Sequence, residues 1–452
     1  MSVGGSVGVK TVDYEYNYLG TLHKKIYQKG SDYEKFEHIY GYDNYQRLAS
    51  VATLQGLENT PVQQAAYSYY LHGPLKRTEL GVQLQGIDYV YTINGWLKSI
   101  NDPSLQTSRD PGADNAAGTH SGFAKDVFGM SLDYHDQDYT RSGTFVQDYF
   151  SATGSLHIRN RYDGTIKAQR WNTVLPSSET NVYSSYSQLM FGYTYDSRGQ
   201  LSGAVFGTAT IGDRNGSSGP VSEQSFSDRP EYRISNVGYD PNGNLSGLRR
   251  TGNNSSNSYL MDDLSYTYNA GKNQLKRVSD LATSGTYVED IDHQADTVNY
   301  EYNSIGQLVL DKQKDVRLEY NVSGLVTKIY TASANELKIE YSYNESGQRL
   351  RKKVYRISGT STTRENALMY YIHDATGSLL AIHEGVESQS LSGGVWSTTL
   401  TTSIDVAEYP IYGQGRIGML NMTASNTIYE LQDHLGNVRA TISRSEERRV
   451  GK

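Results

Sequence analysis

The sequence predicts an all-β fold built from tandem β-hairpins, and two observations carry that prediction. A nine-residue pattern of alternating tyrosines followed by turn residues recurs along the chain. The composition has the same bias, since the 452 residues include 39 Tyr and 44 Gly but only 8 Phe and 9 Pro. Tyrosine favours strands, and glycine permits the positive φ angles of tight turns. The chain is therefore rich in both parts of a hairpin.

The repeated pattern is Tyr-x-Tyr-Asx-x-x-Gly-x-Leu, in which Asx is Asn or Asp. Its clearest copies occupy residues 14–22, 193–201, 237–245, 300–308 and 341–349. Weaker copies occupy residues 40–48, 266–269, 318–324 and 371–377. Recurrence of this kind indicates a repeat protein, in which each unit packs on its neighbours. We therefore expect residues 1–443 to form one array of hairpins.

Each position of the pattern has a physical role. Alternate tyrosines place both rings on one face of a strand. Asx suits the first position of a type I turn, where its side chain can bond the backbone ahead, and Gly suits the fourth. The Leu then begins the returning strand of the hairpin. The predicted turn residues are Asn17, Gly20, Asp196, Gly199, Asp240, Gly243, Asn303, Gly306, Asn344, Gly347, Asp433 and Gly436. The predicted repeat aromatics are Tyr14, Tyr16, Tyr193, Tyr195, Tyr300, Tyr302, Tyr341 and Tyr343.

Consecutive hairpins can support one another where single ones cannot. A lone hairpin is marginal in water, but a series of them can pair edge to edge into one long sheet. Two stretches rich in Gly, Ser and Asp, near 101–121 and 207–230, indicate loop-like insertions between hairpins.

Charge and composition exclude several classes of protein. The net charge is −7 with both signs interspersed, so nothing supports nucleic-acid binding. The absence of cysteine excludes disulfides and thiolate zinc sites. No apolar run is long enough to span a membrane, and the first ten residues do not resemble a signal peptide.

The repeat resembles the YD repeat of Rhs proteins, which is shared with teneurins and with shell components of insecticidal toxin complexes. Gln432-Asp-His-Leu-Gly-Asn-Val-Arg-Ala-Thr441 resembles the Asp-His-Leu-Gly motif that precedes the Rhs core region. The segments at 91–103, 126–130 and 162–171 are similar to the Bacteroidetes variety of these proteins.

This resemblance implies a β-spiral that forms a hollow shell, here open or partial. In the family the shell encloses a C-terminal effector domain, and a core segment that plugs one end cuts itself through aspartates in several members. Family members are secreted or displayed on the cell surface. By this resemblance we expect the 452-residue chain to be truncated before the core region and the cargo. Residues 444–452 change composition abruptly, and we expect a sequencing or vector artefact there, the alternative being a genuine basic tail.

Three groups of residues suggest chemistry at first sight. Asp133, His135, Asp136 and Asp138 offer metal-ligating atoms but lack the loop glycine and distal Glu of an EF-hand, so we expect a solvated turn. Asp433 and His434 are adjacent, and adjacent residues on a strand point to opposite faces. The Asp-Pro pairs at Asp110 and Asp240 have the composition of ordinary turns.

We therefore expect a non-enzymatic structural shell segment without a metal or cofactor. Its expected partner is its own or an adjacent C-terminal effector polypeptide. The alternative is a surface adhesion module that binds glycans on Trp96, Trp171 and Trp396. A hydrolase within 88–206 is a third possibility, but no nucleophile and base are suitably spaced there.

Overall fold

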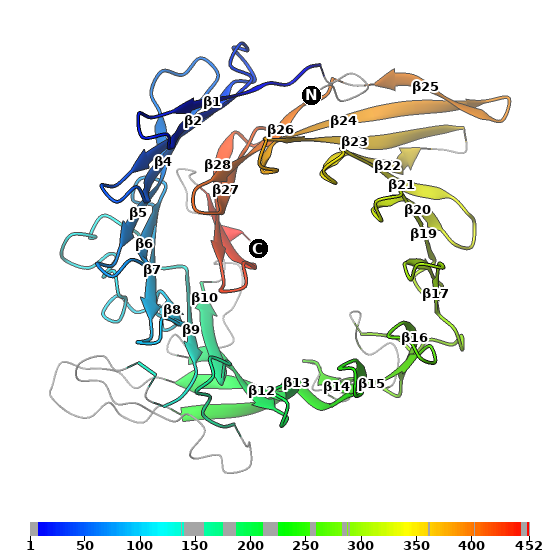
Figure 1. The fold of residues 1–452 in the computed structure, drawn as a ribbon, viewed down its shortest axis with the longest axis horizontal. Helices are drawn as coiled ribbons and strands as arrows, with labels where there is room; N and C mark the ends of the chain where they lie inside the picture. Colours follow the sequence, from blue (N-terminus) through cyan, green and yellow to red (C-terminus); the bar gives the residue numbers. More distant parts are fainter. Residues whose placement is uncertain are drawn as a thin grey trace. The chain divides into compact units, whose positions relative to one another are not determined.

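The computed structural model describes residues 8–136, 138–139, 158–174, 187–210, 225–253, 259–282, 287, 290–359, 362–401, 403–443 and 450–451. Within these ranges the chain contains strands and turns but no helix (Figure 1). None of the described residues can therefore provide an apolar helix of membrane-spanning length. The predicted all-β fold of tandem hairpins is confirmed.

The first sheet has 16 strands, and their hydrogen-bonded order is their order in the chain. These strands are β1 (Val12–Tyr16), β2 (Leu22–Tyr27), β3 (Phe36–Tyr42), β4 (Leu48–Gln55), β5 (Val62–Tyr69), β6 (Leu75–Leu80), β7 (Gln85–Tyr91), β8 (Leu97–Ile100), β9 (Phe128–Asp133), β10 (Ala168–Thr173), β11 (Ser187–Tyr195), β12 (Leu201–Thr210), β13 (Ser225–Tyr239), β14 (Leu245–Thr251), β15 (Leu260–Tyr268) and β16 (Leu275–Asp280).

The second sheet has 14 strands in sequential order, except that β25 pairs with β24 alone. Its strands are β17 (Tyr300–Tyr302), β18 (Leu308–Asp311), β19 (Val316–Tyr320), β20 (Val326–Thr331), β21 (Leu337–Tyr343), β22 (Arg349–Gly359), β23 (Thr363–His373), β24 (Leu379–Ser392), β25 (Val395–Thr401), β26 (Asp405–Tyr412), β27 (Arg416–Asn421), β28 (Asn426–Gln432), β29 (Val438–Ser443) and β30 (Val450–Gly451). Strands that follow one another in the chain thus become neighbours in the sheet, as hairpin repeats require.

The chain divides into two compact units. Unit 1 combines Met1–Tyr67 with Asn299–Glu430 and Ile442–Arg448, so it contains segments from both halves of the sequence. Unit 2 combines Ser68–Val298 with Leu431–Thr441 and Arg449–Lys452. In unit 2, β10–β13 bury a small apolar cluster. Its members are Ala168, Met190, Ala209 and Phe226.

The six predicted turns share one geometry. The N–H of the turn glycine donates to the carbonyl of the Asx residue at 3.0–3.1 Å, and the glycine φ lies between 78° and 90°. The side-chain oxygen of Asn17 also accepts hydrogen bonds from the N–H groups of Leu19 and Thr21, at 2.9 and 3.0 Å. In all six turns the Asx oxygen accepts a bond from the residue four positions ahead. Each turn is therefore closed by its own backbone and by one side chain.

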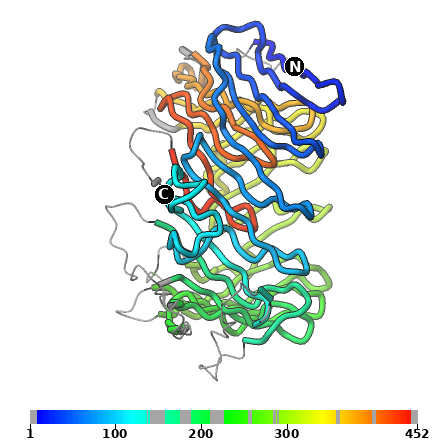
Figure 2. Tube along the Cα trace, turned by 90° about the vertical axis from the view of Figure 1, so that its left-hand side faces the viewer, coloured from blue at the N-terminus to red at the C-terminus, as the bar shows by residue number. Residues whose placement is uncertain are grey.

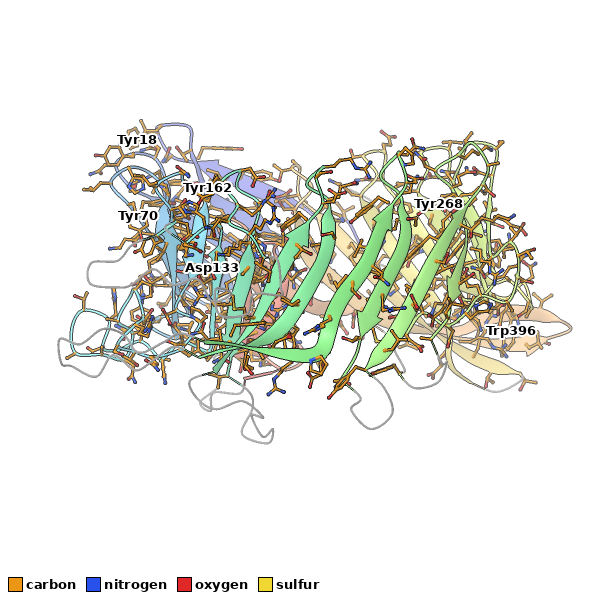
Figure 3. The ribbon with its side chains drawn as sticks, turned by 90° about the horizontal axis from the view of Figure 1, so that it is seen from below. Tyr18, Tyr70, Asp133, Tyr162, Tyr268 and Trp396 are labelled. Carbon is orange, nitrogen blue, oxygen red and sulfur yellow. The ribbon has the colours of Figure 1, made fainter. Side chains whose placement is uncertain are left out.

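A second contact recurs in several hairpins and joins a strand to the strand before it, and we call it the tyrosine link. A tyrosine at or just after the turn end of its strand donates its hydroxyl proton to the backbone carbonyl at or near the start of the preceding strand. The donor and acceptor pairs are Tyr42 and Leu22, Tyr134 and Leu97, Tyr195 and Ile166, Tyr239 and Leu201, Tyr268 and Leu245, Tyr320 and Leu308, and Tyr343 and Val326, at 2.6–2.9 Å. His373 takes the tyrosine's place in one copy, with its Nε2 2.9 Å from the carbonyl of Arg349. Figure 3 shows one donor, Tyr268, at the turn end of β15.

The insertion expected at 207–230 is shorter on both sides than the sequence indicated. Gly207 to Thr210 pair with Ser225 to Asp228, because Ala209 and Phe226 are buried in the apolar cluster and extend β12 and β13 toward each other. Residues 211–224 lie outside the described residues. By contrast, 101–127 contains no strand apart from an isolated bridge at Ala124. The expectation about 444–452 falls mostly outside the described residues.

The turn geometry predicts a sharp difference between two positions of one turn. Gly306 has a φ of 90°, so Gly306→Val places a β-branched residue in a conformation that L-residues avoid. We expect a loss of about 1–2 kcal/mol in unfolding free energy. Ser304→Ala, at an exposed position of the same turn, should change it little. Equal losses in denaturant unfolding would show that the glycine conformation is not what stabilises the turn.

The tyrosine link predicts that single hydroxyl groups stabilise the array. Tyr320→Phe removes the donor that lies 2.6 Å from the Leu308 carbonyl and leaves that carbonyl without this partner. We expect a loss of about 1 kcal/mol, measured by denaturant unfolding. Tyr18→Phe is the matched control, since Tyr18 is 95% exposed beside the β1–β2 turn (Figure 3). A similar loss in the control would contradict a special role for the linked hydroxyl.

Candidate functional site

Segments from the two halves of the chain pack against each other within unit 1. Strands β26–β28 lie beside β2–β5 in both views of the fold (Figures 1 and 2). We call the contact between these strands, together with the neighbouring β23–β24 turn and β24, the terminal clasp. Its buried residues are Lys25, Tyr27, Phe36, His38, Gln64, Asp374, His383, Tyr409 and Tyr429.

Aromatic rings form the centre of the terminal clasp. The rings of Phe36 and Tyr409 stack with 4.5 Å between centroids and 7° between planes. Tyr27 meets Tyr409 edge-on at 6.0 Å, and its hydroxyl lies 2.9 Å from Nε2 of His383. The hydroxyl of Tyr429 donates to Oε1 of Gln64 at 2.6 Å. Because these rings are buried and their polar ends are paired, the contact combines apolar burial with specific alignment.

An ion pair closes the terminal clasp at the β23–β24 turn. Nζ of Lys25 lies 2.5 Å from Oδ2 of Asp374, and the two side chains are only 9% and 0% exposed. Asp374 is also the Asx residue of its own turn and accepts bonds from the N–H groups of Thr376 and Ser378. Burial acts to raise the pKa of Asp374, but its hydrogen bonds with Lys25 and Thr376 hold that pKa below the usual value. Removing either partner would leave a buried charge uncompensated.

Two histidines in the terminal clasp are held in the neutral form. Burial, with Lys25 nearby, lowers the pKa of His38 to about 3. Burial, with Lys10 nearby, lowers the pKa of His383 to about 4. The ring of His38 also packs edge-on against Phe36, with 5.2 Å between centroids. Charging either ring would place a cation in this apolar contact.

The residue pair suggested by the Asp-His-Leu-Gly segment does not form a reactive site. Oδ1 of Asp433 accepts hydrogen bonds from the N–H groups of Leu435 and Asn437, as in the other turns. Burial acts to raise the pKa of Asp433, but hydrogen bonds from Asn437 and its backbone lower it. Burial also lowers the pKa of His434. The arrangement explains Asp433 as a turn residue.

The acidic run at 133–138 is balanced by basic side chains. Asp133 lies 2.6 Å from Lys98 and 2.9 Å from Arg170, which hold its pKa well below the usual value although burial acts to raise it. Asp138 also pairs with Lys98. Asp136 pairs with Lys167 at 2.6 Å. These acids have cationic partners, so the run forms a charged network.

A different acidic group is buried in unit 2, and we call it the aspartate cluster. It consists of Asp88 on β7 with Asp110, Asp114 and Asp126 from the loop between β8 and β9, each at most 6% exposed. One carboxylate oxygen from each of Asp88, Asp110 and Asp114 lies within 4.8 Å of the others. The segments at 91–103 and 126–130 both contribute to this region, through Asn101 and Asp126, which are 3.0 Å apart. The Asp-Pro pair at Asp110 lies in a loop of turns, and the Asp110 side chain is buried there.

The aspartate cluster is poorly suited to four negative charges. Burial, together with Asp110 and Asp114, raises the pKa of Asp126 to about 10. Burial raises the pKa of Asp88 to about 7 although Arg77 opposes it. The Arg77 guanidinium lies 2.5 Å from Asp88 and 2.6 Å from Asp114. In a buried place, carboxyls in this number must bind protons or further cations.

The three tryptophans considered for glycan binding are half-buried and already have packing partners. Trp96 lies against Tyr134 at 5.0 Å between centroids. Trp171 stacks on Phe191 at 5.6 Å. The guanidinium of Arg364 lies 4.3 Å from the ring centroid of Trp396, on the β24–β25 hairpin (Figure 3). The arrangement gives no particular support to a glycan platform.

Sequence reasoning did not predict that the residues of either buried group come together, although it had considered Asp110 and the segments that contain Asp126 and Asp374. Lys25 and Asp374 are 349 positions apart, and nothing local signals their contact. Asp88 lies between apolar residues in the segment Gly-Ile-Asp-Tyr of β7. An acidic residue in such a setting is the sequence feature that could have indicated a buried carboxyl.

Comparisons with known proteins find 30 similar chains among the solved structures. No protein-family model and no curated protein matches the sequence. The chain is similar to chains in the crystal structures of TcdB2-TccC3-TEV (TM-score 0.32, 11% identity) and TcdB2-TccC3-Cdc42 (0.35, 12%), covering 97% of this chain in each. It is also similar to a chain of the Photorhabdus luminescens Tc holotoxin pore with a TccC3 mutation (0.32, 12%, 96% of this chain). The chain spans 23% of the length of each of these chains, and at such TM-scores the similarity carries no argument about its function.

The buried histidines predict that acid weakens the terminal clasp. A histidine whose folded pKa lies below its unfolded value of about 6.5 stabilises the fold fully above that pH, and this contribution is lost as the pH falls toward the folded pKa. Wild type should therefore lose stability between pH 7 and pH 4.5, and His383→Asn should remove about 2 kcal/mol of that loss.

The control for this measurement is His72→Asn, since His72 is exposed. It should retain the whole acid effect in thermal unfolding. Aspartates elsewhere in the chain titrate in all three proteins, so the differences between them isolate His383. An unchanged pH dependence in His383→Asn would be evidence against a neutral, buried His383.

Proposed function

We propose that this chain is a non-enzymatic wall segment of a YD-repeat, Rhs-type protein of the Bacteroidetes variety, which encloses or displays an effector polypeptide. The observation that carries the proposal is the recurrence of the tyrosine link along the array. The hairpins that carry the link are fixed to their predecessors both by strand pairing and by a side chain. A long sheet held in this way suits a wall rather than a catalytic pocket.

The absence of catalysis is part of the same proposal. Asp433 and Asp240, which the sequence offered as reactive residues, bind the N–H groups of their own turns. The acids at 133–138 are engaged with Lys98, Arg170 and Lys167. These contacts favour structural roles for the polar residues that attract attention in the sequence.

Export or surface display of the full-length protein belongs to this proposal, as does an effector polypeptide as partner. The net charge of −7 gives no electrostatic attraction to nucleic acid.

Enclosure is tested by attaching an unfolded, protease-sensitive polypeptide after Ser443. A wall should slow its digestion relative to the same polypeptide attached before Gly8, because one end of the array would face the enclosed space. The unfused chain should also scatter X-rays with a radius of gyration well above the roughly 22 Å of a solid globule of this length.

Equal digestion of the two fusions would count against enclosure. A radius of gyration near that of a solid globule would contradict the wall architecture on which the proposal depends. Hydrolase or nuclease activity in the purified chain, lost together with its fold, would replace the proposal with an enzymatic one.

A further inference from the structure

The aspartate cluster lacks the charge balance found at residues 133–138. In that network Asp133, Asp136 and Asp138 have three basic partners, Lys98, Lys167 and Arg170. In the aspartate cluster, Arg77 is the basic residue that pairs with Asp88 and Asp114. Asp110 and Asp126 add two more carboxyls to the same buried place. The cluster can therefore accept positive charge beyond that of Arg77.

Two oxygens in the cluster have no hydrogen-bond donor. Asp114 is 1% exposed, and its Oδ1 binds Arg77 while its Oδ2 is buried without a partner. Asp110 is 6% exposed, and its Oδ2 accepts the N–H of Asp114 while its Oδ1 has no donor. A buried carboxylate oxygen without a partner is costly, so these two atoms indicate a missing cation or proton.

The backbone around these oxygens is unusually close. A Cβ on Gly86 would come within 2.2 Å of Oδ2 of Asp114, and one on Gly112 within 2.2 Å of Oδ2 of Asp88. Glycine at both positions lets the chain pack directly against the carboxylates. The cluster is thus shaped by its surroundings, and it is not a chance gathering of exposed acids.

We propose that Asp88, Asp110 and Asp114 bind a divalent cation of the Ca²⁺ class, with Asp126 beside the site. The three carboxylates supply hard oxygen ligands, which Ca²⁺ prefers. Oxygens around one Ca²⁺ lie at 2.3–2.6 Å from it, so two ligands can be up to about 5 Å apart, and the three carboxylate oxygens, within 4.8 Å of one another, satisfy that limit.

Arg77 is compatible with an ion at this position. It binds Oδ2 of Asp88 and Oδ1 of Asp114, leaving Oδ2 of Asp114 for the cation. Other titratable groups facing the cluster are Glu79, which binds Arg77, and His120, whose Nε2 lies 3.7 Å from Glu79. A bound cation would connect Asp88 on β7 with Asp110 and Asp114 in the loop between β8 and β9. Its role would be to hold the long strand-free segment at 101–127 in one conformation.

The test is calorimetric titration of the full chain with Ca²⁺ after removal of metals with EDTA, together with thermal unfolding. Ca²⁺ should bind at one site and raise the unfolding temperature, because a ligand that binds only the folded state stabilises it. Asp110→Asn should weaken binding more than about tenfold, a loss that even outer-shell changes produce at metal sites. Asp136→Asn, the same substitution in the balanced network, should bind Ca²⁺ as wild type does.

Absence of Ca²⁺ binding in wild type would overturn the proposal and leave a proton shared between Asp110 and Asp126 as the explanation. Wild-type affinity in Asp110→Asn would overturn it as well. If that variant fails to fold, wild-type crystals soaked in Mn²⁺ decide the matter by anomalous scattering. A peak among the three carboxylates supports the site, and the lack of one there excludes it.

Discussion

The hydroxyl of a tyrosine at the turn end of one strand meets the first carbonyl of the strand before it, and the array depends on this contact. Strand pairing alone fixes neighbours through the backbone, which any sequence can provide. The hydrogen bond from Tyr268 to Leu245, or from Tyr320 to Leu308, is made by a side chain at the edge where the turns lie. It therefore requires a particular residue type at that position, which backbone pairing does not. It aligns successive hairpins and satisfies a carbonyl near the sheet margin. A tyrosine can do this because its ring packs on the sheet while its hydroxyl reaches the edge.

The array needs such contacts because much of it is thin. Every residue of β19, β20 and β21 is half-buried and none is fully buried, so these strands have no deep core. Stability must then come from many repeated local contacts, as in other repeat proteins. Deep burial is concentrated elsewhere, in the apolar cluster around Met190 and in the terminal clasp around Tyr409. The terminal clasp differs from the repeats because strands far apart in the sequence cover it.

Identical residue types have opposite consequences in the two acidic groups. Around Asp133, basic side chains neutralise the carboxylates, and the result is a structural network. Around Asp110 and Asp126, carboxyls face carboxyls in a buried setting, and the pKa of Asp126 rises accordingly. The sequence directed attention to the first group, where four candidate ligands stand within six residues. The second group was not predicted as a group, because its members are spread from residue 88 to residue 126.

The sequence by itself determined the repeated hairpin, the turn residues and the all-β class. Those features depend on contacts between residues about four positions apart, such as Asn303 and Gln307, and the same local chemistry recurs in the six predicted turns. Only the tertiary structure decided which carbonyl each tyrosine hydroxyl finds, and which carboxyls share the aspartate cluster. It alone brought Tyr27 to His383, 356 residues away. Such contacts depend on how strands stack and which faces are covered, and a short-range pattern of residues carries no information about partners so far along the chain.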